Sequence, residues 1–71
     1  MANKERFIKI YSKGTMTKNE IWLDTETGVN YFYHAASGGY NGGMTPLLGK
    51  DGKPVVYTEA EILSAVKGSS D

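Results

Sequence analysis

The feature that most restricts the fold is a glycine-dense stretch that runs from Ala35 to Gly52. Six of the nine glycines of the 71-residue chain fall within it. The paired glycines on both sides of Tyr40 and Asn41 leave backbone N–H groups bare and permit positive φ angles. A flexible linker would be rich in serine, whereas here bulky residues such as Met44 are interleaved with the glycines. The stretch is therefore predicted to be an ordered loop, and it is the first place to look for function.

The length of the chain predicts one domain over residues 1–71, with frayed ends at 1–5 and 69–71. It contains no cysteine, which excludes disulfides and thiolate metal sites. Eight basic and eight acidic residues give a net charge of zero, which argues against a binder of DNA or RNA polymers. No stretch has the length of a membrane span or the character of a signal peptide, so a cytoplasmic protein is expected, in the host cytoplasm if a phage encodes it.

Alternation of apolar and polar residues predicts strands at 6–11, 20–24 and 29–35, with a brief strand at 55–57. The segment from Asp24 to Gly28 is the strongest turn signal, because the carboxylate can accept from amides further on and the glycine can take a left-handed conformation. The predicted sheet has two partly apolar faces. One carries the isoleucines, Leu23 and the tyrosines, and the other carries Phe7, Trp22 and Phe32.

A helix is predicted to begin after Thr58, because the segment Thr58-Glu59-Ala60-Glu61 forms a capping box, and to end at Gly68. Its expected buried stripe is formed by Ile62, Leu63 and Val66. The resulting fold class is α+β, a small antiparallel sheet of three or four strands with one C-terminal helix. One helix of about ten residues cannot cover both faces of a sheet. The uncovered face predicts a homo-oligomer, with a tetramer as one option.

The residues offer little for catalysis or for metal binding. His34 is the single histidine, and a serine- or histidine-assisted hydrolase would need Asp24 or Glu26 to orient it. Metal ligands at workable spacing are missing, and the acidic residues already serve the predicted turn and helix start. The interpretation is a protein without enzymatic activity, metal or cofactor. A minimal hydrolase that uses His34 remains the less favoured alternative.

The glycine stretch is compatible with a small nucleotide ligand. Neither the Walker pattern nor the dinucleotide fingerprint is present. What remains is an aromatic ring at Tyr40, an amide at Asn41, a hydroxyl at Thr45 and a lysine at Lys50, which suit a base and its phosphate. An equally open reading is that the glycines let the loop fold back tightly, with Tyr40 and Met44 in the core.

Two stretches of the chain carry a family resemblance. They are Asp24-Thr25-Glu26-Thr27-Gly28-Val29-Asn30-Tyr31 and Gly39-Tyr40-Asn41-Gly42-Gly43-Met44-Thr45-Pro46-Leu47-Leu48, with Gly52-Lys53-Pro54 after them. This pattern resembles domain-of-unknown-function family 6440, a widespread family of small bacterial and phage proteins with no established activity. The chain departs from it at Phe32 and Met44, where leucine is usual. It departs again at Gly49, where an aspartate is usual, and so lacks a carboxylate beside the glycines.

The chain is also similar, more loosely, to phage proteins that act as sponges for nucleotide immune signals. Those proteins are small oligomers that trap cyclic oligonucleotides of anti-phage systems such as CBASS, in pockets between subunits and without cleavage. The similarity implies the same function here, as an anti-defence sponge. The residues expected at the ligand are Tyr40 with Trp22 or Tyr31 for stacking, Asn30, Asn41 and Thr45 for polar bonds, and Gly42, Gly43, Lys50 and Lys53 for phosphate. The alternative of a different class is a protein–protein interaction module that uses the same loop.

Overall fold

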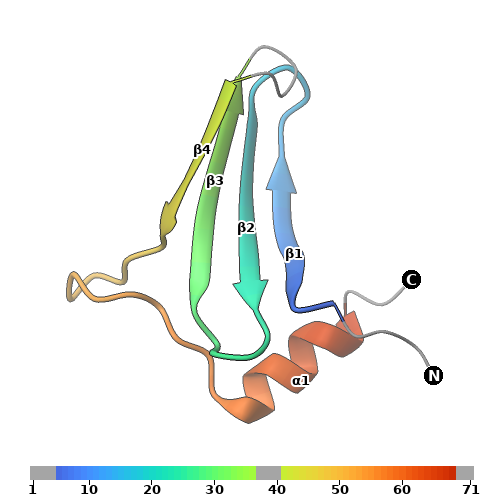
Figure 1. Ribbon diagram of the computed structural model, residues 1–71, viewed down its shortest axis with the longest axis vertical. Coiled ribbons are helices and arrows are strands. Elements are labelled where there is room, and N and C mark those ends of the chain that lie inside the picture. Colours follow the sequence, from blue (N-terminus) through green and yellow to red (C-terminus); the bar gives the residue numbers. More distant parts are fainter. Residues whose placement is uncertain (1–4, 37–40, 69–71) are drawn as a thin grey trace.

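The computed structural model describes residues 5–36 and 41–68, and it shows a four-stranded antiparallel sheet followed by one helix (Figure 1). The strands β1 (Phe7–Lys13), β2 (Lys18–Asp24), β3 (Asn30–Ala36) and β4 (Asn41–Pro46) lie in chain order across the sheet, and α1 spans Glu59–Gly68. The predicted α+β class is confirmed. Within the described part of the chain, no helix has the length and apolar character needed to cross a membrane.

The glycine-dense stretch is partly a strand, so the prediction of a loop there is wrong for residues 41–46. Gly42 and Gly43 are not among the glycines with positive φ, and their extended backbone pairs with β3 in continuous register from Tyr31↔Pro46 to Ala36↔Asn41. Glycine weakens a strand but does not forbid one when a neighbour supplies the ladder. The predicted strand at 55–57 is also wrong, since this segment forms one isolated bridge, Val29↔Val56.

The turn between β2 and β3 confirms the predicted role of Asp24. Its side chain accepts hydrogen bonds from the Glu26 backbone N–H at 2.9 Å and from the Thr27 hydroxyl at 3.0 Å. Arg6 adds a bidentate pair, with Nε 2.8 Å from Oδ1 and the terminal nitrogen 2.9 Å from Oδ2. Gly28 closes the turn at a φ of 84°, where a Cβ would lie 2.4 Å from the Tyr57 carbonyl oxygen. Both the conformation and the close approach therefore require glycine.

The register corrects the predicted distribution of the aromatic residues between the two faces. Trp22 pairs with Tyr31, and Ile21 pairs with Phe32. Since paired residues share a face, the tyrosines of β3 lie with Trp22, and Phe32 lies with Ile21 and Leu23. We call these the Trp22 face and the Phe32 face. The Trp22 face carries Glu20, Trp22, Asp24, Tyr31, Tyr33 and Met44, and the Phe32 face carries Ile21, Leu23, Asn30, Phe32, His34 and Thr45.

A bulge in β1 adds two further residues to the Phe32 face. Lys9 pairs with Trp22, but Tyr11 pairs with Ile21, so β1 advances two residues while β2 advances one. The extra residue at Ile10 reverses the alternation of the strand. Tyr11 and Lys13 consequently lie on the Phe32 face, although simple alternation predicts that Tyr11 shares a face with Lys9.

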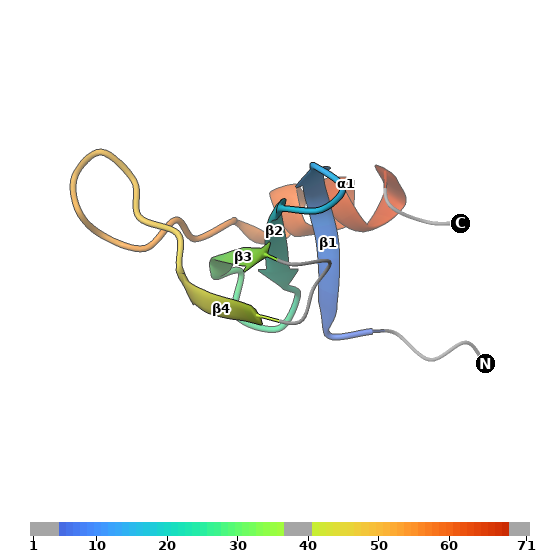
Figure 2. The same ribbon diagram turned by 90° about the horizontal axis from the view of Figure 1, so that it is seen from above.

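The helix begins as predicted but is not buried as predicted. Thr58 and Glu61 form the reciprocal capping box, with N–H to Oε1 at 2.8 Å and N–H to Oγ1 at 3.2 Å. No residue of α1 is buried, and Leu63 is 61% exposed. The prediction of a buried stripe is therefore wrong for a single copy of the chain. The helix lies across one end of the sheet and to one side of it, where it can cover only part of a face (Figures 1 and 2).

The core of the described chain is very small. Leu23 and Ala35 are its only buried hydrophobic residues in the described ranges, whereas Phe7, Tyr11 and Met44 are about half exposed. A domain of this size buries a modest share of its surface even when it is well packed. The sheet thus displays apolar side chains on both faces, as the sequence pattern predicts. Self-association of the chain stays a prediction.

Candidate functional site

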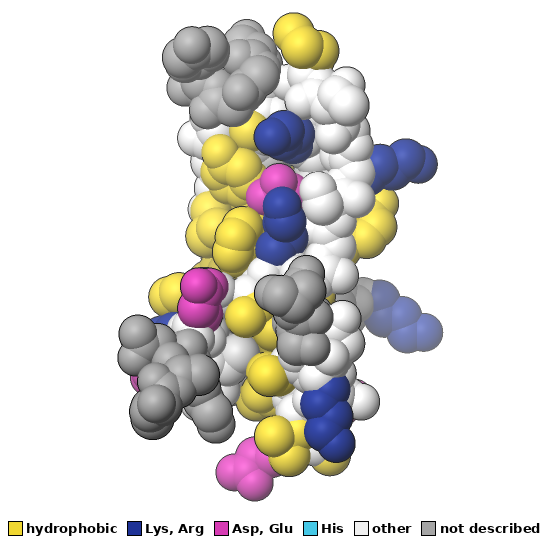
Figure 3. All heavy atoms as spheres, turned by 90° about the vertical axis from the view of Figure 1, so that its right-hand side faces the viewer, with side chains coloured by type: hydrophobic (Ala, Val, Ile, Leu, Met, Phe, Trp, Pro, Cys, Tyr) yellow, Lys and Arg dark blue, Asp and Glu magenta, His cyan; other side chains and the backbone are white. Residues whose placement is uncertain are grey.

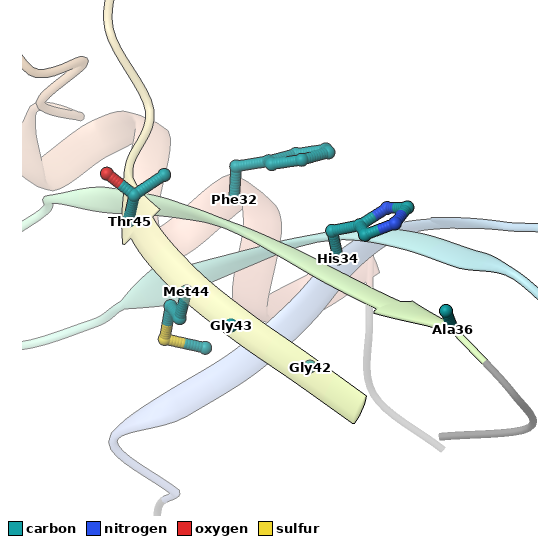
Figure 4. A pocket seen from close by; sticks show the side chains of 7 residues that line it. All are labelled: Phe32, His34, Ala36, Gly42, Gly43, Met44 and Thr45. Atoms are coloured by element: carbon teal, nitrogen blue, oxygen red, sulfur yellow. The ribbon is translucent and has the colours of Figure 1, made fainter. Parts of the chain in front are cut away.

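A shallow, open groove of about 500 Å³ lies on β3 and β4 near the predicted glycine site. It is lined by Phe32, His34, Ala36, Gly42, Gly43, Met44 and Thr45. Figure 4 shows Phe32, His34 and Thr45 on one side of the two strands and the Met44 side chain on the other. The usable surface of this β3–β4 groove therefore belongs to the Phe32 face, with an aromatic ring, an imidazole and a hydroxyl above a glycine backbone.

Residues that line the groove belong to two rows of paired residues that cross all four strands. The first row runs from Lys13 through Asn19 and His34 to Gly43. Within it, His34 Nδ1 and Asn19 Oδ1 share a hydrogen bond of 2.8 Å, which orients the exposed imidazole.

The second row runs from Tyr11 through Ile21 and Phe32 to Thr45. Tyr11 is 47% exposed, and Phe32 is half-buried. A polar row thus lies beside an aromatic row. This is the combination that a flat ring bearing a charged or hydroxylated group would contact.

The fold has a reason to require glycine at position 42 of β4 but not at the adjacent position 43. A Cβ at Gly42 would lie 2.5 Å from the Tyr33 hydroxyl oxygen, because that ring covers the glycine on the Trp22 face. A Cβ at Gly43 would meet no atom of the described residues within 4 Å, and Gly43 has no positive φ. The chain itself therefore does not require glycine at position 43. A glycine within a strand can mark a place where a ligand or another backbone approaches closely.

The structure brings together only part of the predicted ligand site. Gly42, Gly43 and Thr45 line the groove. Tyr40 lies outside the described residues, and Asn41 is described only as the first residue of β4. Trp22 and Tyr31 are on the opposite face, so they cannot form a second wall beside Thr45 within one chain.

Asn30 is removed from the candidate ligand residues by its burial. Its side chain is 1% exposed, and its amide nitrogen donates to the carbonyls of Gly28 and Val55 at 3.4 and 3.3 Å. Its backbone N–H also donates to Val55, and its carbonyl accepts from Leu47. Asn30 ties β3 to the segment that follows β4, which is a structural role.

Lys50 and Lys53 lie in a turn at the far end of β4 from the two glycines. Asp51 holds this turn by accepting from the Lys53 backbone N–H at 3.0 Å. Gly42 and Gly43 precede the last residue of β4 by four and three residues, about 10–13 Å, and the turn that carries the lysines begins beyond that end. The structure therefore does not bring the lysines to the groove that the two glycines line.

Asp24, one of the two groups predicted to orient His34 in the hydrolase alternative, lies on the other face of the sheet. Asp24 lies on the Trp22 face, and the bidentate contact with Arg6 holds its pKa well below the usual range, against the opposing effect of burial. His34 lies on the other face and has the Asn19 amide as its partner. Among residues 5–36 and 41–68, no group of three or more histidine and carboxylate side chains could hold a metal ion.

Four of the groove-lining residues were not assigned to a ligand from the sequence, namely Phe32, His34, Ala36 and Met44. Nor were Tyr11, Lys13 and Asn19 placed in the same rows as these residues. Alternation in β3 already places Phe32 and His34 on one face. Thr45 lies beside Phe32 only because residues 41–46 form a strand that pairs with β3. Tyr11 and Lys13 lie on the same face only because of the bulge in β1.

Comparison with known protein families finds a match for most of the chain. The model of a family of unknown function, DUF6440, matches residues 6–57, a range that contains all four strands and ends before α1. No curated protein and no solved structure matches the chain.

Proposed function

The chain belongs to the family of unknown function DUF6440, and we propose that it is a non-enzymatic binding protein that holds a small nucleotide-like ligand in the β3–β4 groove. The proposal is carried by Gly43. This position is free of neighbours and free of backbone strain, yet it has no side chain. A bare backbone in the floor of an open groove lets a flat ligand approach within van der Waals distance of the strand.

The chemistry around Gly43 favours a nucleotide over a purely apolar ligand. The ring of Phe32 offers a stacking surface, and stacking of a base on an aromatic ring contributes about 1–3 kcal/mol. The Thr45 hydroxyl and the imidazole of His34 can bond to base edges, ribose or phosphate. Lys13, at the end of the polar row, supplies a cation on the same face.

The groove has the features of a holding site more than of a catalytic one. His34 is oriented by an amide, and no carboxylate of residues 5–36 and 41–68 bonds to its ring to stabilise an imidazolium during proton transfer. The protein would sequester its ligand and release it unchanged. Such a role suits capture of a cyclic oligonucleotide immune signal in the cytoplasm, by an oligomer whose copies cover the apolar faces left exposed in one chain.

Isothermal titration of the full chain against a panel of cyclic di- and trinucleotides tests the proposal. Heat of binding is expected with at least one of them, and the ligand recovered after denaturation should have its original mass. Gly43→Val puts a branched side chain on the groove floor, at a position where a Cβ meets no described atom within 4 Å, and should abolish binding. Met44→Val changes the same strand on the other face and should leave binding intact. Absence of heat at high micromolar protein, or recovery of cleaved ligand, would contradict the proposal.

A protein–protein interaction module is the second candidate, favoured by the apolar side chains outside the groove. Leu48, Val56 and Leu63 are each more than half exposed, and they follow β4 in the chain. A protein partner that covers them should be captured by wild type and by Gly43→Val, but not by Leu63→Ser. Loss of capture in Gly43→Val alone would instead place the contact at the groove.

A further inference from the structure

The two edges of the sheet differ in how they are protected against pairing with another strand. β1 carries a bulge and two lysines, Lys9 and Lys13, and lysine and arginine side chains stand on this side of the molecule (Figure 3). Bulges and lysines are the usual protections of an exposed edge. The β4 segment has no charged residue, and its register with β3 is unbroken. The edge at β4 is therefore open to pairing.

The hydrogen-bond pattern fixes which backbone groups of β4 point outward. The Leu47 N–H donates to the Asn30 carbonyl at 2.9 Å, so position 47 faces β3. Because inward and outward positions alternate in an antiparallel ladder, Thr45 and Gly43 also face β3. The N–H and C=O groups of Gly42 and Met44 then point away from the sheet. Pro46 has no N–H and ends the run of donors.

From this pattern we propose that a second copy of the chain pairs antiparallel with β4, with Gly43 on the two-fold axis. Gly42 then exchanges hydrogen bonds with Met44 of the partner subunit, and Met44 with Gly42 of the partner subunit. The outward groups are self-complementary under this rotation, and no charge opposes it. The two glycines at the axis form a non-hydrogen-bonded pair, with Cα atoms about 4.5 Å apart.

The pairing joins two half-sites into one, an inference that rests on the proposed function. A two-fold axis perpendicular to the sheet keeps the Phe32 faces of both copies on the same side. Each groove then continues into the other across a floor formed by Gly43 from each chain. The two His34 residues lie three strand spacings apart, about 14 Å, with a Phe32 ring beside each. A site with this symmetry fits a ligand that has two linked bases, and a cyclic dinucleotide is the chemical class that matches it.

The mass of the particle in solution, measured by sedimentation equilibrium, tests this pairing of two β4 strands, which we call the seam. Met44→Pro removes one outward N–H and leaves the bonds to β3 in place, so it should halve the particle mass relative to wild type. Met44→Val keeps that N–H and should keep the wild-type mass. Gly43→Lys puts two like charges opposite each other at the axis. It should also halve the mass at low salt, with recovery at high salt, and circular dichroism should show that each variant is folded.

The outcomes separate the seam from the proposed function. A wild-type monomer at high micromolar concentration, or a particle whose mass Met44→Pro does not change, overturns the seam even if a nucleotide binds. An oligomer that Met44→Pro divides, but that gives no heat with any cyclic nucleotide, retains the seam and removes the ligand. Titration with cyclic diguanylate as the probe should give one ligand per two chains, and one ligand per chain would contradict the shared site.

Discussion

The turn at Asp24 and the groove at Gly43 lie toward opposite ends of the sheet and are built in opposite ways. At the turn, both carboxylate oxygens are bonded within the chain, and glycine is required by its φ angle and by a close carbonyl. At the groove, Gly43 contacts nothing that a side chain would displace, and Thr45 and His34 are exposed. Residues whose polar groups are bonded and buried within the chain explain the fold, and the exposed residues beside Gly43 are the ones that a ligand could reach.

The largest expected effect comes from removing the carboxylate of the turn. Asp24→Ala should lower the free energy of unfolding by about 2–4 kcal/mol, because it removes the Arg6 pair and leaves the Glu26 N–H and Thr27 hydroxyl without their acceptor. Urea unfolding measures this loss. Asp51→Ala is the matched control in the exposed second turn and should cost less than about 1 kcal/mol. Equal losses of unfolding free energy in Asp24→Ala and Asp51→Ala would mean that the Asp24 turn is no more important to the fold than the exposed second turn.

The same carboxylate predicts a pH dependence of stability. The folded-state pKa of Asp24 is depressed, chiefly by Arg6, below the unfolded value of about 3.9. Its contribution is therefore fully present above the unfolded pKa and is lost as the pH falls through the folded pKa. At pH values below about 4, the urea concentration at the unfolding midpoint of wild type should decrease. In Asp24→Asn this part of the drop should be missing, and identical pH profiles would disprove the assignment.

A smaller effect should separate the two neighbouring glycines. Gly42→Ala forces the Tyr33 ring to move and should cost about 1 kcal/mol. Gly43→Ala enters open space and removes backbone entropy from the unfolded chain, so its stability should be equal to that of wild type or higher by about 0.5 kcal/mol. Thermal melts of the two variants side by side give the difference. A larger loss in Gly43→Ala would mean that the fold itself needs that glycine.

The smallest effect is expected in the helix. Leu63 is 61% exposed, so Leu63→Ser should change the stability of the isolated chain by no more than about 0.5 kcal/mol. Unfolding at low and at high protein concentration measures it. A loss of stability that grows with protein concentration would show that α1 is covered in an oligomer. The exposed side chains of α1 would then be engaged by another copy of the chain.

Local patterns in the sequence were enough to predict the parts of the fold that depend on local chemistry. The Asp24 turn, the capping box at Thr58 and the first three strands follow from residues within a few positions of one another. The family pattern was recognised from the same kind of local motif. The helix stripe failed because Leu63 has the correct spacing for burial, but the chain provides no surface that covers it.

The site could be predicted only in part because it depends on register. Glycines at 42 and 43 favour a loop by propensity, and only pairing with β3 makes them a strand. The placement of Trp22 with Tyr31, away from Thr45, follows from the length of the turn and not from alternation alone. Gly43 and Thr45, two of the predicted ligand residues, do line the groove, but the sequence could not supply their neighbours across the sheet.

The single extra residue at Ile10 decides what the last three residues of β1 display. Deleting it would restore strict alternation, and Tyr11 and Lys13 would move to the side that carries Lys9 and Trp22. A one-residue length change, with every other side chain retained, would thereby remove the ring of Tyr11 and the cation of Lys13 from the face that carries the β3–β4 groove. What each face of this small sheet displays is thus set by a count of residues as much as by their identities.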